Sequence, residues 1–260
     1  MGWKQFIKAK GRGSVLFVPF RDFYQMIFNR SRWKSRKGMH RFYSQFVGPG
    51  DLVFDVGANV GDYTEMFARL GARVLAIEAN PELIATLSKI RPRRRIRVEA
   101  VAVGSSDGWA DLFVCGQDQL GTLSKEWIDV AEKSERLSGF KWKSSGRVRV
   151  TTLDSLIDRH GLPDFIKVDV EGFESEVLEG LRSLPKVLSF EFNAENALAA
   201  EVCLHKRCIP EDAKFNLIIQ LNMRFEFPSW ITREELINYL RSPAIKDSAT
   251  WGDIFVRREN

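Results

Sequence analysis

The stretch that decides the fold is Leu52-Val53-Phe54-Asp55-Val56-Gly57-Ala58-Asn59-Val60-Gly61. Its first five residues are apolar except for one acid, which predicts a buried strand. Two glycines follow, as expected for a tight turn, because glycine accepts positive φ angles. Apolar side chains then recur at helical spacing until Gly71 ends the pattern. The stretch therefore predicts a strand, a glycine turn and a helix in succession.

The same alternation continues along the chain. Strands are expected at 52–56, 74–77, 96–103, 110–114, 148–152, 165–170, 187–192, 216–220 and 254–256. Helices are expected at 60–70, after Pro81, and at 153–159, 173–184, 195–206 and 233–241, the last opened by Thr232 and Glu235 in capping-box spacing. Alternating strands and helices predict an α/β fold with a mostly parallel central sheet and helices on both faces. Ligands of such sheets bind beyond the carboxyl ends of the strands.

Charge is distributed unevenly along the 260 residues, whose net charge is +5. Residues 1–50 contain eleven Lys and Arg but one acid, Asp22, so the remainder of the chain is mildly acidic. Gly48-Pro49-Gly50 is a turn signal that separates the two parts. We expect a basic, aromatic leader at 1–48 and one domain at 49–260. The leader, through residues 1–43, suits contact with an anionic membrane surface, although packing of its aromatic residues on the domain is the favoured interpretation.

The three cysteines are too few and too uneven for a disulfide framework, which favours a reducing compartment and a cytoplasmic location. Cys203, His205 and Cys208 lie close together, but no second pair of ligands follows, so no structural zinc site is expected. No segment reaches the ~20 apolar residues of a membrane-spanning helix.

Four of the expected strands end in an acid. These acids are Asp55, Glu78, Asp169 and Glu191. If the strands are parallel neighbours, the four carboxylates line one edge of the sheet, where burial without a partner is costly. One such acid is explained by a helix cap or an ion pair. Four at one edge favour a ligand site.

Two classes of cofactor suit a glycine turn beside such acids. A dinucleotide requires G-x-G-x-x-G, and here Asn59 takes the place of the second glycine. S-adenosylmethionine has no phosphate but carries a sulfonium cation, an amino-acid end and a ribose, which acids can bind. Glu78 follows Gly61 after one helix and one strand, where a carboxylate can accept both ribose hydroxyls. The chemistry of the turn therefore favours S-adenosylmethionine over NAD.

At this point the chain resembles the FkbM-like methyltransferases. The resemblance is carried by Phe54–Gly61, Ile77–Pro81, Ala100–Gly104, Val150–Leu156, Ile166–Glu174 and Phe190-Glu191, and it covers about 51–193. The segment Lys167-Val168-Asp169-Val170-Glu171-Gly172 is its most specific part. The resemblance implies a class I methyltransferase (Rossmann-like) fold, S-adenosylmethionine as the donor, and O-methylation of a sugar, glycan or secondary metabolite.

Site roles follow as hypotheses. The donor is expected on Asp55, Gly57, Asn59, Gly61 and Glu78 with its neighbour Ala79, and on Ala102 beside the adenine. Asp169, Glu171 and Glu191 are expected to face the hydroxyl-bearing acceptor, with Glu171 as the first choice of base and Glu191 the second. Mg²⁺ between Asp169, Glu191 and Asn193 is a weighed alternative that is not favoured, and no metal ligand is assigned.

Two other functions stay open at this stage, an NAD-dependent oxidoreductase and a donor-binding module without catalysis. A nucleic-acid substrate is ranked low despite the basic leader and the arginines at 91–97. The polar stretch 116–145 has too few apolar residues for a core element and is expected to be a lid, an acceptor-binding loop or a surface insertion.

Overall fold

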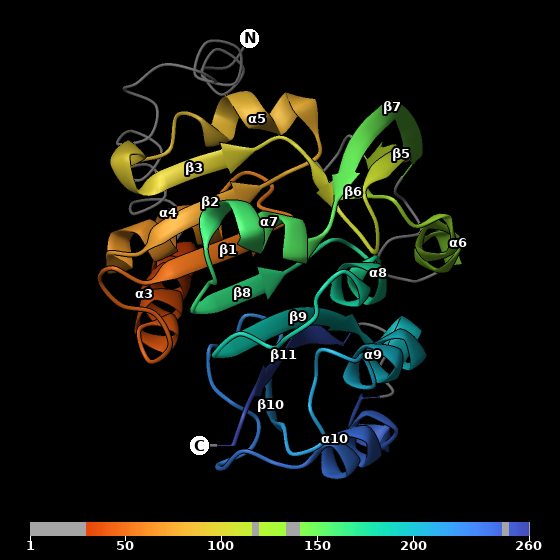
Figure 1. The fold of residues 1–260 in the computed structure, drawn as a ribbon. Helices are drawn as coiled ribbons and strands as arrows, with labels where there is room; N and C mark the ends of the chain where they lie inside the picture. The colour runs from red at the N-terminus through yellow and green to blue at the C-terminus, as the bar shows by residue number, and fades with distance from the viewer. Residues whose placement is uncertain (1–29, 116–119, 134–140, 246–249, 260) are drawn as a thin grey trace, which may run out of the picture.

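The computed structural model describes residues 30–115, 120–133, 141–245 and 250–259 (Figure 1). Its larger sheet has seven strands in the order β10-β11-β9-β8-β1-β2-β3. The strands are β1 (Leu52–Val56), β2 (Arg73–Ile77), β3 (Ile96–Glu99), β8 (Phe165–Val168), β9 (Val187–Asn193), β10 (Lys214–Ile219) and β11 (Trp251–Arg257). β11 runs antiparallel between β9 and β10, and the other neighbours pair in parallel. The predicted mostly parallel central sheet is confirmed.

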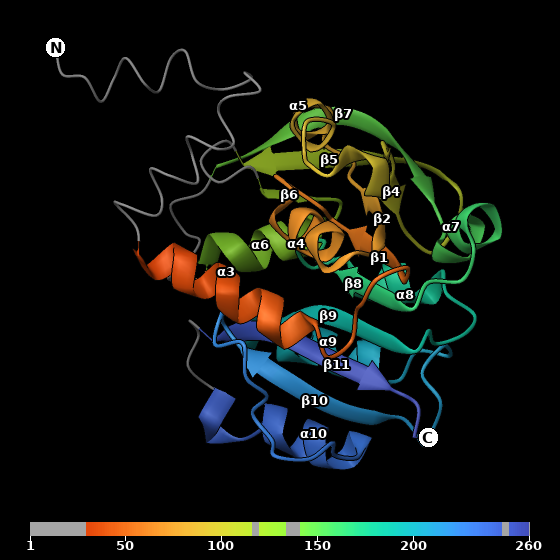
Figure 2. The same ribbon diagram turned by 90° about the vertical axis from the view of Figure 1, so that its left-hand side faces the viewer.

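Helices cover both faces of this sheet (Figures 1 and 2). They are α3 (Arg30–Tyr43), α4 (Asp62–Leu70), α5 (Pro81–Leu87), α7 (Leu153–His160), α8 (Glu174–Glu179), α9 (Ala197–Leu204) and α10 (Arg233–Leu240). Buried residues of α7, α8, α9 and α10 form one core cluster with the sheet, and those of α3 and α4 form a second. Both faces are therefore covered, as the alternation of strands and helices predicts.

Side chains of the central strands alternate between these two clusters, because successive residues of a strand point to opposite faces. Phe54 and Val56 of β1 belong to the first cluster, whereas Val53, which directly precedes Phe54, belongs to the second. Asp55 therefore points to the face covered by α3 and α4. By the same alternation, Lys167 of β8 points to that face, as does Phe165, which belongs to the second cluster.

The C-terminal end of α3 is part of this second cluster. Met39, Phe42 and Tyr43 are buried there against α4 and the sheet, and Tyr43 makes edge contacts with the rings of Tyr63 and Phe67. The proposed membrane contact through residues 1–43 falls mainly on 1–29, which lie outside the described residues, so the leader at 1–48 stays a prediction. Within the described ranges, no helix has both the length and the apolar character needed to cross a membrane.

A second, four-stranded sheet lies beyond the carboxyl ends of the central strands (Figure 1). Its strands, in the order β4-β7-β5-β6, are β4 (Ala102–Val103), β5 (Gly108–Cys115), β6 (Leu120–Thr122) and β7 (Trp142–Thr151). The predicted single strand at 96–103 is therefore wrong. Its first half pairs with β2 as β3, and its second half pairs with β7 as β4. The continuous strand-like pattern of 96–103 did not reveal that the chain passes from one sheet to the other.

The expectation that 116–145 holds no core element is also wrong for its described part. It contains β6, the first residues of β7 and a helix, α6 (Lys125–Lys133). Trp127 of α6 is 1% exposed and packs with Ala131 in a small cluster of its own. One large ring thus supplies the buried surface that a count of apolar residues underestimates.

Candidate active site

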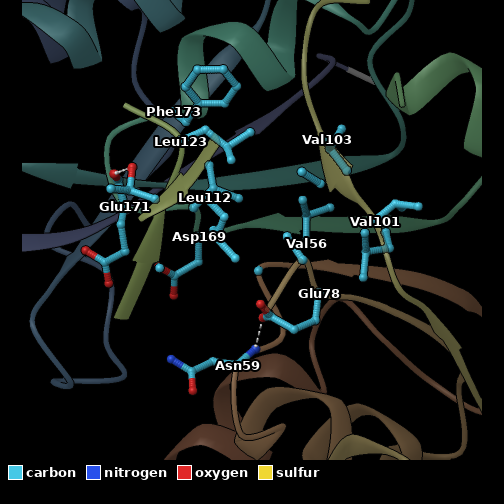
Figure 3. Close-up of a pocket in the computed structure, with 17 residues that line it drawn as sticks. Val56, Asn59, Glu78, Val101, Val103, Leu112, Leu123, Asp169, Glu171 and Phe173 are labelled. Carbon is cyan, nitrogen blue, oxygen red and sulfur yellow. Dashed lines mark hydrogen bonds between the residues drawn. The ribbon is translucent and has the colours of Figure 1, made fainter. Parts of the chain in front are cut away.

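A cavity opens at the carboxyl ends of β1, β2 and β8, between the central sheet and the second sheet (Figure 3). The central sheet contributes Val56, Gly57, Asn59 and 77–79, and the chain beyond β8 contributes 169–171 and Phe173. The second sheet and the segment leading into it contribute 101–103, Leu112 and 121–123. The cavity lies where the α/β topology predicts a ligand, beyond the strand ends.

The glycine turn forms one wall of this cavity. Gly57 has φ +79°, and a Cβ atom built on it would lie 1.8 Å from the carbonyl oxygen of Asp169. The backbone N–H groups of Gly57 and Ala58 both donate to the carbonyl of Ile77, at 2.9 and 3.0 Å. A side chain at position 57 would therefore push the end of β1 away from β8, and glycine is required for this close approach.

Glu78 holds the turn and the next helix together. One oxygen of its carboxylate accepts from the Asn59 backbone N–H at 2.7 Å, and the other accepts from the Asn80 N–H at 2.8 Å. The side chain is buried at the cavity wall, facing Asn59 (Figure 3). Burial raises the pKa of Glu78, and the N–H groups of Asn80 and Asn59 act against that rise. Each carboxylate oxygen keeps a lone pair for a ligand, because one oxygen can accept two hydrogen bonds.

Asp55 and Gly61, which the sequence places among the donor-binding residues, do not line the cavity. Asp55 is 2% exposed, and its carboxylate accepts from the hydroxyl of Thr64 on α4. Burial raises the pKa of Asp55 to about 6, which the Thr64 hydrogen bond opposes. Gly61 precedes α4 with φ +85°, and a Cβ atom there would lie 2.0 Å from the side chain of Ile90. Both residues therefore stabilise the shape of the turn without lining the cavity.

Other predicted donor residues do line the cavity. Gly57, Asn59, Glu78, Ala79 and Ala102 are all among its walls. The sequence did not single out Leu112, Val103 or Phe173, which add apolar surface. Leu112 lies on β5 and is brought to the site only by the pairing of the second sheet. No local pattern could have revealed it.

Three carboxylates meet on the other side of the cavity. Oxygens of Asp169, Glu171 and Glu191 lie within 4.8 Å of one another. Asp169 and Glu171 line the cavity itself (Figure 3), whereas Glu191 lines a separate small pocket that Trp127 and Asn193 also line. Burial raises the pKa of Glu191 well above its usual range, and the carboxylates of Glu171 and Asp169 raise it further. The three acids expected at the acceptor side are thus brought together, although such clusters also form without a metal ion.

The turn that carries Glu171 is held in an unusual conformation. Glu171 has φ +53°, in the left-handed region that few non-glycine residues adopt. Its carbonyl accepts from the Thr122 hydroxyl at 2.7 Å, which ties the turn to the second sheet (Figure 3). From the other side, the carboxylate of Glu174 accepts from the N–H groups of Val170 and Gly172 at 3.1 and 3.3 Å. Burial raises the pKa of Glu174 to about 7.

Comparison with known proteins places this site in a family. The family model described as "Methyltransferase FkbM domain" matches residues 55–218. That range is more than half of the chain and extends the resemblance expected over 51–193.

Two curated relatives are methyltransferases with different names. The hexuronic acid methyltransferase AglP of Haloferax volcanii is 27% identical over 144 residues, which are 54% of this chain and 54% of that protein. The ribosomal RNA large subunit methyltransferase E of Archaeoglobus fulgidus is 35% identical over 65 residues, covering 23% of this chain and 34% of that protein. The chain thus spans about half, or less, of the curated relatives that it matches.

Two solved structures match this chain at low identity and with low TM-scores. The crystal structure of methyltransferase FkbM from Methylobacillus flagellatus KT has 16% identity and a TM-score of 0.45, and the match covers 84% of this chain and 50% of that one. The precorrin-6y C5,15-methyltransferase of Geobacter metallireducens GS-15 has 11% identity and a TM-score of 0.42, with 85% and 87% covered. At this similarity, neither structure assigns a role to a residue of this chain.

Proposed function

Because the chain belongs to the FkbM-domain methyltransferases, we propose that it transfers a methyl group from S-adenosylmethionine to a hydroxyl group of a sugar, glycan or secondary metabolite. The observation that carries this proposal is the cavity itself. It brings the glycine turn and Glu78 together with the carboxylates of Asp169 and Glu171 in one space.

The donor side is proposed at the glycine turn. Glu78 would accept hydrogen bonds from the ribose hydroxyls. Its carboxylate oxygens have lone pairs for them beyond those used by the two backbone hydrogen bonds. Gly57 and Asn59 would border the methionine end, since the backbone there can be approached without a Cβ atom in the way. Ala79 and Ala102 would flank the adenine. Asp55 and Gly61 would contribute indirectly, because they hold the turn in shape.

The chemistry of the donor suits this lining. When bound, S-adenosylmethionine supplies a methyl group on a positively charged sulfur, and that sulfur leaves with the electron pair of the broken C–S bond. Asp169 places negative charge near the cation. The walls Val56, Val101, Val103, Leu112 and Phe173 exclude water from it. Alignment of the acceptor oxygen with the methyl group would supply much of the rate enhancement.

The acceptor side is proposed at Asp169, Glu171 and Glu191. As the new C–O bond forms, the hydroxyl proton must leave the oxygen, and the Glu171 carboxylate in the cavity is our first choice to take it. Glu191 is the second choice, and its raised pKa would make its carboxylate the stronger base. Mg²⁺ is not part of the proposal.

The charge of the cavity favours a neutral acceptor over a nucleic acid. Glu78, Asp169 and Glu171 are the charged residues among the described lining, and none of that lining is Lys, Arg or His. Nucleic-acid sites neutralise phosphates with basic side chains. A hydroxyl of a neutral carbohydrate therefore suits the site better. The hexuronic acid in the name of the Haloferax relative is a carbohydrate too, but an anionic one, so it agrees in class and not in charge.

Calorimetry with S-adenosylmethionine and, separately, with NAD tests the donor. The proposal requires binding of the first and not of the second; binding of NAD alone would favour an oxidoreductase. Methyl transfer is then measured with a donor labelled in its methyl group, on a panel of neutral sugars and on RNA. Binding without transfer to any acceptor would leave the donor-binding module as the better description.

Glu171→Gln separates binding from catalysis. We expect this variant to bind the donor like the wild type and to lose methyl transfer by about 10²–10⁴-fold, the range of general-base catalysis.

The three cysteines, Cys115, Cys203 and Cys208, are free. We therefore keep a cytoplasmic location as part of the proposal.

A further inference from the structure

Lys167 stands apart from the other charged residues of the chain. It is 1% exposed and is the only Lys or Arg among the buried residues in the described ranges. It lies on β8, two residues before Asp169, and does not line the cavity. A buried ammonium group is costly unless it is paired, so its surroundings must account for it.

Acids on, or directly after, three neighbouring strands lie near this lysine. Its ammonium nitrogen lies 2.7 Å from a carboxylate oxygen of Asp169 and 3.5 Å from one of Asp253 on β11. Glu191 is paired with Asp253 in the register of β9 and β11. Side-chain alternation puts all of them on the face covered by α4.

The ring of Tyr63 completes the enclosure. The Lys167 nitrogen lies 4.4 Å from the centre of this ring on α4, a cation–π distance. Burial lowers the pKa of Lys167, but the carboxylates of Asp169 and Asp253 outweigh burial and raise it well above its usual value. The lysine is therefore a fixed positive charge with a cavity acid on one side and a structural anchor on the other.

We propose that Lys167, anchored by Asp253 and Tyr63, is a positioning residue that holds the Asp169 carboxylate at the meeting point of donor and acceptor. This inference rests on the proposed function, because it assumes that the cavity binds S-adenosylmethionine. Asp169 lies between the glycine turn, where its carbonyl packs against Gly57, and the carboxylates of Glu171 and Glu191. Without Lys167, the like charges of Glu171 and Glu191 would turn the Asp169 carboxylate away from that point.

A double-mutant cycle distinguishes this role from simple core packing. The affinity of S-adenosylmethionine is measured by calorimetry for the wild type, Lys167→Met, Asp169→Asn and the double variant. Methionine keeps most of the apolar stem and removes the charge. We expect each single variant to weaken binding by about tenfold and the double variant to bind no more weakly than Asp169→Asn, because residues that act through each other are not additive.

Matched variants complete the experiment. Lys167→Arg keeps the charge and should restore most of the affinity, and Asp253→Asn should weaken binding less than Lys167→Met because Asp169 still holds the lysine. Lys186→Met removes a lysine from another lysine–aspartate pair, with Asp164 at the opposite end of β8, and should bind like the wild type. If Lys167→Met does not fold, Lys167→Arg and Asp253→Asn still rank the affinities.

Three results would overturn the inference. They are additive losses in the cycle, wild-type affinity in Lys167→Met, and wild-type affinity in Asp169→Asn. Each of these leaves the proposed function intact, since the wild type still binds the donor. A wild-type protein that binds no S-adenosylmethionine would instead refute the proposed function, which keeps the two failures distinct.

Discussion

Replacing Glu78 tests the donor site most directly. Its two oxygens already accept the N–H groups of Asn59 and Asn80. Glu78→Ala would leave both N–H groups without this acceptor, and an unsatisfied buried donor costs about 1–3 kcal/mol. We therefore expect the free energy of unfolding to fall by at least about 2 kcal/mol, measured by urea denaturation.

Glu78→Ala should also weaken the binding of S-adenosylmethionine, and by far more than a loss of stability alone would. A hydrogen bond to a charged group contributes about 1.5–3 kcal/mol, so two lost ribose contacts amount to about 3 kcal/mol or more. That is a loss of affinity above about 100-fold for S-adenosylmethionine, measured by calorimetry. Glu78→Gln keeps one acceptor oxygen, so its affinity for S-adenosylmethionine should fall by about tenfold.

Asn80→Ala is the matched control. The Asn80 side chain caps α5 by accepting from the Glu82 N–H at 3.0 Å, so its loss should cost about 1 kcal/mol of stability at the same corner of the fold. Its donor affinity should stay at the wild-type value. If Glu78→Ala binds S-adenosylmethionine as tightly as the wild type, or no more weakly than Asn80→Ala, Glu78 does not hold the ribose.

Three further predictions concern other parts of the site. Burial raises the pKa of Glu174 to about 7, so its stabilising contribution is complete below its unfolded pKa of about 4.3 and is lost as the pH rises through 7. The unfolding free energy of the wild type relative to Glu174→Gln should fall by about 3 kcal/mol between pH 4 and pH 8, and a pH-independent difference would contradict this. Gly57→Ala should weaken donor binding by more than about tenfold through its contact with the Asp169 carbonyl, whereas Gly50→Ala, at φ +92° with nothing within 4 Å, should not. Removal of divalent metal with EDTA should change the donor affinity by less than about twofold, and a loss that Mg²⁺ restores would show a metal site at Asp169, Glu171 and Glu191.

Local sequence signals were reliable where the structure depends on near neighbours. The helix after the glycine turn ends at Gly71 with φ +102°, as the pattern indicates. Thr232 and Glu235 form the predicted capping box at the start of α10. These features are set by contacts within a few residues, so the chain reveals them without its fold.

The same signals failed where contacts join distant segments. The sequence places Asp55 and Glu78 at equivalent strand ends, but Asp55 lies within β1 and points toward Thr64, whereas Glu78 follows β2 and faces the cavity. The Thr122 hydroxyl reaches the Glu171 carbonyl across 49 positions of the chain. Which residues line the cavity therefore depended on strand register and on the second sheet, not on spacing.

The sequence by itself determined the α/β class, the glycine turn and the order of acids at the strand ends, because periodicity and glycine content act locally. The tertiary structure decided which acids meet. Asp169, Glu191 and Asp253 come together because β8, β9 and β11 are neighbours, and Lys167 lies among them although Asp253 is 86 positions away. Strand order and register depend on how distant segments pack in the sheet, so they could not be predicted from the local patterns of one sequence.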